Sequence, residues 1–213
     1  MTEEIHTISA ELLDLLKLIE RAFEIEADQE YLDCARAYLE KPYQAQTEGG
    51  KKYMRMGLAQ LKDTFAKYDK SEDKSLWCDY LDASYAELFL GVTQEASEPV
   101  ESCYMNDERV LYCRQYFQVK AMMDEYDFEK PKNFEEPEDH IAMELKFYIF
   151  LQESALATKK ADYASELLAA AAVLKKDHMD PWFGRACKAI AEGDDAGFYA
   201  AMSYFTQAAL AEI

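Results

Sequence analysis

The segment IAMELKFYIFL, from Ile141 to Leu151, indicates the fold more strongly than any other stretch of the chain. Apolar side chains fall on nearly every face of the helix that it would form, and such a helix is usually central and buried. Pro137 precedes it in a position suited to the first turn of a helix. Glu138 and Asp139 then lie near the positive end of the helix dipole. The segment therefore predicts a buried helix that begins at Pro137.

Helical spacing continues on both sides of this segment. Apolar residues recur every three or four positions at 12–23, 54–68 and 77–89. Alanine-rich segments in the last third of the chain, one of them at about 196–211, also read as helices. With only seven glycines and five prolines, long helices are favoured over many short strands. The sequence thus predicts an all-α protein, a single helical-bundle-like domain of about nine helices.

Residues with a preference for helix starts divide these segments. Ser75 and Asn106 are suited to cap the helices that follow them. Asp162 is expected to cap a further helix, and Asp180 with Pro181 is expected to restart the chain after it.

Two polar stretches interrupt the helical pattern. Thr47–Lys52 contains two glycines, so we expect a loop there. Val92–Met105 is short, polar and centred on a proline, and it is the predicted hinge of the domain. The hinge would join an N-terminal lobe of about residues 1–91 to a C-terminal lobe of about residues 106–213.

The chain is strongly acidic, with 42 acidic against 23 basic residues and a formal net charge of −19. Such a field repels the phosphates of nucleic acids and anionic lipid headgroups. We therefore expect no nucleic-acid partner, whereas a basic peptide would be attracted. Solubility alone also explains the charge.

The cysteines and the hydropathy of the chain indicate its compartment. Five cysteines are scattered without a CxxC motif, so neither a disulfide framework nor a zinc site is expected. The first ten residues contain Glu3 and Glu4 and no basic region, unlike a secretory signal peptide. No stretch of about 18 apolar residues is present that would span a membrane. We expect a cytoplasmic protein with reduced thiols.

The densest polar cluster is EEPEDH, from Glu135 to His140. His140 and Glu144 are four residues apart and could share a helix face, but the Glu-x-x-His pattern of di-iron bundles is absent because Pro137 stands three residues before His140. Nucleophile motifs and phosphate-binding glycine loops are also missing. We expect no catalytic residue, no metal and no cofactor. On the residues alone, the cluster is explained as an acidic helix start with His140 packed against its neighbours.

The order of the motifs carries more information than any one of them. Tyr-x-x-Leu-Phe-x-Gly begins at Tyr85, Pro-x-Glu-Ser-x-Tyr at Pro99 and Glu-Pro-x-Asp-His at Glu136. Asp-Pro-Trp-Phe follows at Asp180. In this order and spacing, the sequence from about Leu76 to Ala191 resembles the TorD/DmsD/NarJ family of redox-enzyme maturation chaperones.

The resemblance implies an all-helical chaperone in two lobes and not an enzyme. Members of that family bind the twin-arginine signal peptide, or leader, of a molybdoenzyme catalytic subunit. They hold the precursor in the cytoplasm until its cofactor has been inserted. Carried over position by position, the implied leader-binding residues are Tyr85, Leu88, Phe89, Pro99, Ser102, Tyr104, Pro137, Asp139 and His140.

These positions suit the chemistry of a leader, which has a pair of arginines followed by an apolar segment. Asp139 and the acidic residues around it can accept the guanidinium charges. Tyr85, Leu88 and Phe89 can supply an apolar groove. His140 is expected either to orient Asp139 or to make binding sensitive to pH.

Two other classes of function stay open on the sequence. One is a helical-repeat scaffold that binds another protein, and the other is a metal-dependent helical-bundle enzyme. The sequence names no particular molybdoenzyme as the partner. Because the predicted hinge can either fold back or extend, we also expect a mainly monomeric protein with a minor dimer in which two chains exchange halves.

Overall fold

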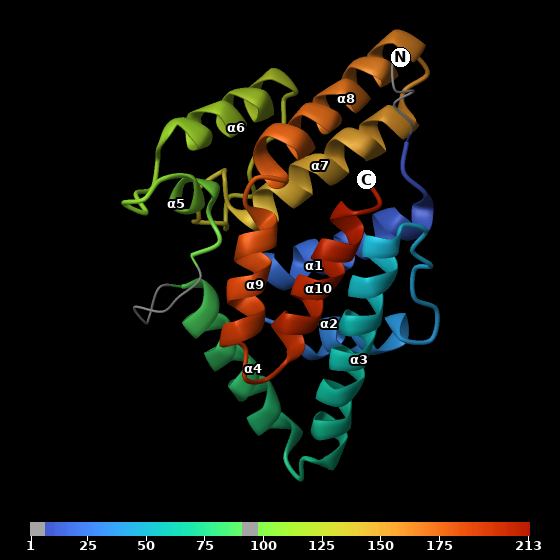
Figure 1. Ribbon diagram of the computed structural model, residues 1–213, viewed down its shortest axis with the longest axis vertical. Coiled ribbons are helices and arrows are strands. Elements are labelled where there is room, and N and C mark those ends of the chain that lie inside the picture. The colour runs from blue at the N-terminus through green and yellow to red at the C-terminus, as the bar shows by residue number, and fades with distance from the viewer. Residues whose placement is uncertain (1–6, 91–97) are drawn as a thin grey trace. The chain divides into compact units, whose positions relative to one another are not determined.

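The computed structural model describes residues 7–90 and 98–213, and its regular structure is helical (Figure 1). Within these residues there are ten α-helices, one π-helical segment and no β-strand. An isolated antiparallel bridge joins Val100 to His140. The predicted all-α class is confirmed, with ten helices where about nine were expected.

The elements follow one another along the chain as α1 (Ala10–Glu24), α2 (Gln29–Tyr38), α3 (Glu48–Lys70), α4 (Lys74–Phe89), α5 (Glu101–Met105), α6 (Arg114–Glu125), α7 (Ile141–Ala157), α8 (Ala161–Leu174), the π-helical segment η1 (Lys175–Met179), α9 (Phe183–Gly193) and α10 (Phe198–Leu210). None of the described helices is both long enough and apolar enough to cross a lipid bilayer.

The helices group into two compact units, each built from two separate segments of the chain. The first unit comprises Met1–Glu20 and Pro99–Phe183, and the second comprises Arg21–Glu98 and Gly184–Ile213. The predicted single domain of two lobes joined at 92–105 stays a prediction. Residues 91–97, which include most of the predicted hinge, lie outside the described residues.

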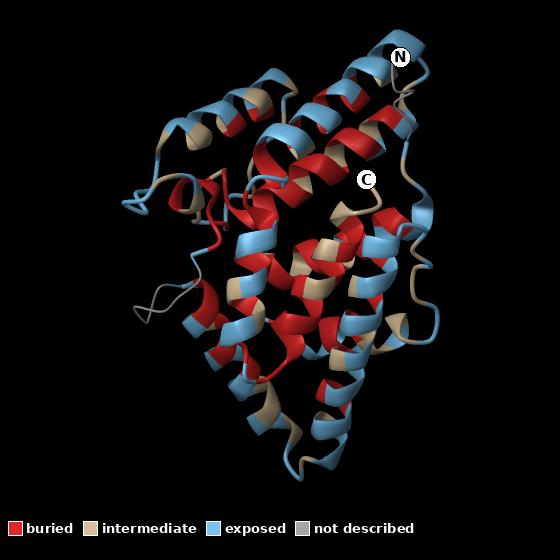
Figure 2. Cartoon of the chain, viewed as in Figure 1, coloured by how far each residue is buried: buried red, intermediate tan, exposed pale blue. Residues whose placement is uncertain are grey.

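Helix α7 is the centre of the first unit's core, as its apolar sequence predicted. Ile141, Leu145, Phe147 and Leu151 have no exposed surface, and Figure 2 shows the helix buried along most of its length. Its long contact with α8 buries Leu174 and other apolar residues of that helix. The apolar faces of α7 are therefore buried by the residues packed around it.

The predicted start of α7 at Pro137 is wrong. The chain makes a turn there instead, closed by a hydrogen bond of 3.1 Å from His140 N to Pro137 O. Helix α7 begins only after His140, whose ring Nδ1 accepts a hydrogen bond of 3.2 Å from Ala142 N. A histidine side chain thus occupies the capping position that is more often filled by serine, threonine or aspartate.

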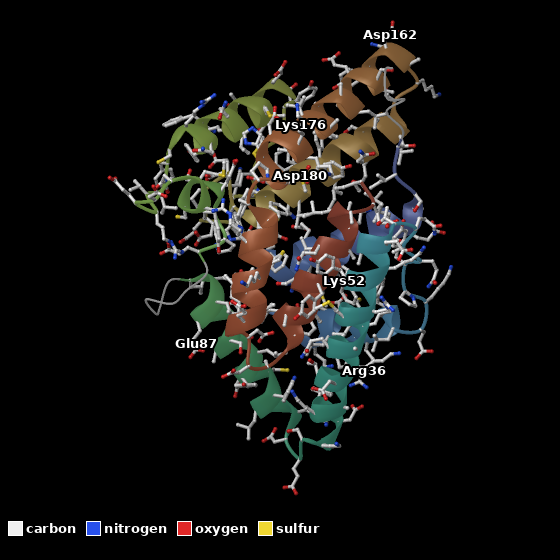
Figure 3. The ribbon with its side chains drawn as sticks, in the orientation of Figure 1. Arg36, Lys52, Glu87, Asp162, Lys176 and Asp180 are labelled. Atoms are coloured by element: carbon white, nitrogen blue, oxygen red, sulfur yellow. The ribbon has the colours of Figure 1, made fainter. Side chains whose placement is uncertain are left out.

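In the second unit, α3 and α10 make the most extensive helix contact of the structure. Gly57 lies in this contact against the ring of Phe205, which is fully buried. Figure 3 labels Arg36 of α2. Its guanidinium lies over the ring of Phe65 at 4.4 Å and pairs with Asp69 at 2.8 Å. A residue without a side chain at position 57 lets the two helices approach closely.

We expect Gly57→Ala to lower the free energy of unfolding by roughly 1–3 kcal/mol. A Cβ at this position would lie 2.5 Å from two carbons of the Phe205 ring and 3.2 Å from Ala201 O, so the helices would have to separate. Chemical denaturation measures the effect. Gly184→Ala is the matched control, because a Cβ there meets nothing within 4 Å. Equal stability of both variants would contradict the tight contact.

Several other predicted boundaries are wrong because different residues cap the helices. Thr47–Lys52 is not a loop, since Thr47 Oγ1 accepts a hydrogen bond from Gly50 N at 2.9 Å and α3 starts at Glu48. Asp73 rather than Ser75 caps α4. Asp162 lies inside α8, whose N-cap is Lys160.

The segment after the described end of α4 also differs from its prediction. The predicted hinge contains a short helix, α5. Asn106 does not begin the next helix, because it is the C-terminal cap residue of α5 and α6 begins only at Arg114. Its side chain bonds to Val110 in the irregular loop between the two helices. After α8 the chain continues through η1 and a turn, so α9 starts at Phe183 and not at Asp180–Pro181.

Candidate functional site

Two segments of the first unit are joined by a network centred on Asp139, here called the Asp139 clasp (residues 99–102 with 139–141). Asp139 Oδ2 accepts hydrogen bonds from Ser102 N at 2.9 Å and from Ser102 Oγ at 2.6 Å. Backbone bonds of 2.8 Å run from Glu101 N to Asp139 O and from Ile141 N to Pro99 O. The clasp fixes the start of α5 against the start of α7.

Asp139 has no exposed surface, and burial raises the pKa of its carboxyl group while the Ser102 hydrogen bonds lower it. The carboxyl of Asp139 is thus closed to solvent in this structure, and its expected contact with an arginine of a leader stays a prediction. Its geometry is that of a group that holds two backbone segments together.

His140 is enclosed next to Asp139, with 1% of its surface exposed. Its ring packs edge-on against Phe134, with a centroid distance of 5.2 Å. Burial lowers the pKa of His140 to about 3, so the ring is neutral at physiological pH. A pH-sensitive role for His140 near neutrality is thus disfavoured, and the structure shows a neutral helix cap.

Glu138, another acidic residue of the Glu135–His140 string, is paired with nearby lysines. Glu138 lies 3.2 Å from Lys120 and 3.5 Å from Lys130. Lys130 also donates a hydrogen bond of 2.7 Å to Glu136 O, and Pro137 is buried. The charge of Glu138 is therefore already compensated within the protein, whereas Glu135 is exposed.

The predicted apolar groove residues belong to the core of the second unit. Tyr85, Leu88 and Phe89 are 5%, 5% and 4% exposed. The Tyr85 hydroxyl donates to Phe23 O at 3.3 Å, and the ring of Phe89 lies 5.3 Å from that of Tyr199. Packing explains these positions in this structure, and their part in leader binding stays a prediction.

The nine predicted site residues are thus divided between the two units. The first unit brings Pro99, Ser102, Asp139 and His140 together in the Asp139 clasp. Tyr104, in the same unit, is half-buried against the ring of Trp182 at 5.4 Å.

Sequence reasoning missed a second buried polar group in the first unit. His178 Nδ1 lies 2.9 Å from Glu101 Oε2, and Trp182 Nε1 donates to Glu144 Oε2 at 3.3 Å. Burial raises the pKa of Glu101 and raises that of Glu144 strongly. The neighbouring Glu101 raises the pKa of Glu144 further, whereas hydrogen bonds with His178 and Glu144 lower that of Glu101. Glu101 and Trp182 belong to the quoted motifs, whereas no motif singled out His178.

A cavity of about 520 Å³ opens beside this group and is lined by residues of α5, α6, the end of α8 and η1. Its lining comprises Glu101, Met105, Arg114, Gln115, Gln118, Ala121, Met122, Val173, Asp177 and His178. All of these residues belong to the first unit.

Apolar side chains are exposed next to the cavity, on the loop before α6 and on α6 itself. We call them the α6 patch: Val110, Leu111, Tyr112 and Phe117, which are 48%, 40%, 55% and 62% exposed. Arg109 and Tyr112 have positive φ angles of 51° and 57°. Neighbouring exposed apolar residues and strained backbone are both more frequent at binding surfaces than elsewhere.

Metal binding is not indicated by this geometry. Within residues 7–90 and 98–213, no group of three or more histidine, cysteine, aspartate or glutamate side chains could hold a metal ion.

The comparison with protein families identifies the chain's relationship. The model of the nitrate reductase delta subunit family matches residues 48–188. The chain belongs to this family. The match confirms the resemblance to the TorD/DmsD/NarJ chaperones, and it covers all four motifs, including the Asp139 clasp and Trp182.

The chain is also similar to individual proteins that are named as TorD chaperones. The chain is 28% identical over 125 residues to "Chaperone protein TorD" of Aliivibrio salmonicida, which is 59% of this chain and 58% of the relative. The chain is 32% identical over 124 residues to the protein of the same name from Photobacterium profundum, which is 57% of this chain and 56% of that relative. It is 29% identical over 133 residues to the protein of the same name from Shewanella oneidensis, which is 60% of this chain and 56% of that relative. The chain thus spans between half and two thirds of the length of these relatives, and their names are those of chaperones rather than enzymes.

Proposed function

We propose that this family member is a cytoplasmic chaperone for a molybdoenzyme, not an enzyme itself. It binds the twin-arginine leader of the catalytic subunit's precursor and assists cofactor insertion and folding before export. The observation that carries the proposal is the family match over residues 48–188, together with relatives that are named as TorD chaperones. That match includes every motif on which the resemblance was based.

The physical properties of the chain suit such a ligand. A net charge of −19 attracts a basic peptide at long range. The exposed α6 patch offers apolar contact to the segment that follows the arginines in a leader. Because Tyr85, Leu88 and Phe89 are buried, the α6 patch is the better candidate for this contact.

Co-purification tests the proposal. The chain is produced together with candidate precursors, such as those of dimethyl sulfoxide, trimethylamine N-oxide and nitrate reductases, each with and without its leader. We expect one full-length precursor to be retained and its leaderless form to be lost. Retention of both forms alike would contradict leader recognition and favour a scaffold that binds the folded enzyme.

The oligomeric state also belongs to the proposal. We propose a mainly monomeric protein with a minor dimer formed by exchange of halves through residues 92–105. Light scattering after size-exclusion chromatography, repeated after concentration, should show a slowly growing dimer. A single monomeric species at every concentration would contradict the exchange.

A further inference from the structure

Two carboxyl groups meet in the buried polar group of the first unit. Glu101 of α5 and Glu144 of α7 have no exposed surface, and their side chains share a hydrogen bond. We call these two residues the carboxyl pair. A hydrogen bond between two carboxyl groups requires a proton on one of them, because an ionised carboxylate can only accept. The carboxyl pair therefore contains at least one proton in the folded chain.

The other hydrogen bonds of the carboxyl pair indicate which residue carries this proton. His178 Nδ1 lies 2.9 Å from Glu101 Oε2 and favours the charged form of Glu101. Glu144 Oε2 accepts a longer hydrogen bond, of 3.3 Å, from the neutral Trp182 Nε1. Burial, and then the closeness of Glu101 and Asp139, raise the pKa of Glu144 well above its ordinary value. Glu144 is thus the neutral acid, and it donates to the carboxylate of Glu101.

Charged groups surround the carboxyl pair on α6, η1 and the loop before α7. Asp139 lies in that loop, and its charge raises the pKa of both carboxyls. Arg114 of α6 lines the same cavity as Glu101, as do Asp177 and His178 of η1. A second negative charge in the carboxyl pair would therefore face the charges of Glu101 and Asp139 at once, in a site without water contact.

The position of α5 depends on the carboxyl pair, because this helix is only five residues long. The Asp139 clasp fixes its start to the start of α7. Glu101 also reaches Glu144, in the first turn of α7, and His178 of the π-helical segment η1. Short π-helical segments are frequently found at functional sites, and Figure 3 labels Lys176 of this one. The carboxyl pair thus joins α5 to both α7 and η1.

We propose that the carboxyl pair is a proton-dependent link between α5 and α7. The link holds while the two carboxyls share a proton. When the proton is lost at alkaline pH, two buried carboxylates face each other and α5 separates from α7. Because α5 borders the cavity of about 520 Å³, the shape of this surface then changes with pH. This link goes beyond the proposed function and does not depend on it.

The direction of the pH dependence follows from the raised pKa of Glu144. Such a group contributes stability that is fully present below the unfolded pKa of about 4.3 and is lost as the pH rises through the folded value. Between these two values, one bound proton changes the equilibrium constant of unfolding by about tenfold per pH unit. Alkaline pH therefore weakens the link, whereas acid preserves it.

The first experiment detects the proton itself. The side-chain carboxyls of glutamate are labelled with carbon-13 in the full chain and observed by NMR at about pH 7, where ordinary glutamates are ionised. We expect one signal of a protonated carboxyl group, and we expect Glu144→Gln to lack it. Absence of the signal from the wild type, or its persistence in Glu144→Gln, would overturn the proposal. The wild-type spectrum decides the matter even if the variant does not fold.

The second experiment measures the pH dependence of stability. In Glu144→Gln the amide nitrogen can donate to Glu101 and the amide oxygen can accept from Trp182, so this variant imitates the protonated acid at every pH. Urea denaturation at about pH 6 and 8 should show the wild type losing stability relative to Glu144→Gln, by up to about 100-fold in the equilibrium constant of unfolding. The control, Glu166→Gln, removes the same charge from an exposed position of α8 and should show a constant ratio. A constant ratio for Glu144→Gln would overturn the proposal.

The last experiment tests the separation of α5. Trp182 donates to Glu144, and its ring lies 5.4 Å from that of Tyr104 on α5, so its fluorescence reports on both. Trp77→Phe removes the other tryptophan of the chain. In Trp77→Phe we expect a reversible change in Trp182 fluorescence as the pH rises, before circular dichroism shows any loss of helix. Adding Glu144→Gln should abolish this step. No step before global unfolding, or a step that Glu144→Gln leaves unchanged, would contradict the link.

Discussion

Asp139→Ala is expected to lower the free energy of unfolding by roughly 2–4 kcal/mol, because two buried donors lose their acceptor. Those donors are the amide and the hydroxyl of Ser102, at 2.9 and 2.6 Å from Asp139 Oδ2. Removing the carboxyl also relieves its repulsion with Glu144, which offsets part of the loss. The net effect should appear as a lower midpoint in urea denaturation.

Two further variants serve as comparisons for Asp139→Ala. Asp139→Asn keeps an oxygen acceptor for Ser102 and should be less than half as damaging. Asp162→Ala, at an exposed position near the start of α8, should leave stability almost unchanged. An Asp139→Ala variant with wild-type stability and much weaker leader binding would contradict the Asp139 clasp. It would make Asp139 a direct ligand contact.

His140→Asn should change the response of the protein to acid. Burial lowers the pKa of His140 to about 3, against an ordinary value of about 6.5 in the unfolded chain. A depressed histidine pKa contributes stability that is fully present above the unfolded value and is lost as the pH falls towards the folded value. Between pH 7 and 4.5 this loss amounts to about 2.5 kcal/mol, so His140 should dominate acid unfolding.

Asparagine at position 140 retains an oxygen that caps α7 but has no proton to gain. At pH 7 the variant should be less stable than the wild type, because the ring that packs on Phe134 is lost. The difference should shrink by about 2.5 kcal/mol at pH 4.5. Urea denaturation at the two pH values measures it. A constant difference would mean that His140 is accessible to protons in the folded state.

The stability of His140→Asn has to be compared with that of the wild type at each pH, because the titration of other groups changes stability with pH in the opposite direction. Burial raises the pKa values of Glu101, Asp139 and Glu144. Their contribution is present below the unfolded pKa of a carboxyl group and is lost as the pH rises through the folded values. The difference between wild type and His140→Asn cancels these contributions.

The helical fold was predictable because it depends on spacing and composition. The segment from Ile141 to Leu151 is apolar on nearly every face, and a central position is needed to bury those faces. Helix starts were predicted less well, since several residues near each start are able to cap it. Asp73 precedes Ser75 by two residues, and its carboxylate accepts hydrogen bonds from the amides of Ser75 and Leu76.

The candidate site was predictable only as a set of motifs. The order of the motifs led to the family, but a short polar motif has no periodicity from which burial follows. Asp139 was therefore interpreted as a partner for an arginine, although it is buried and accepts a hydrogen bond from Ser102, 37 residues earlier. The Glu101–His178 pair joins residues 77 positions apart, and only the folded chain brings them together.

The central claim is that the chain recognises the arginines of a leader, and one titration tests it most directly. A synthetic peptide with the leader sequence of the retained precursor is titrated into the full chain in a calorimeter. A second peptide carries glutamine in place of both arginines. We predict saturable binding of the first peptide and at least roughly tenfold weaker binding of the second. Equal affinity for the two peptides, or no binding of either, would contradict the claim.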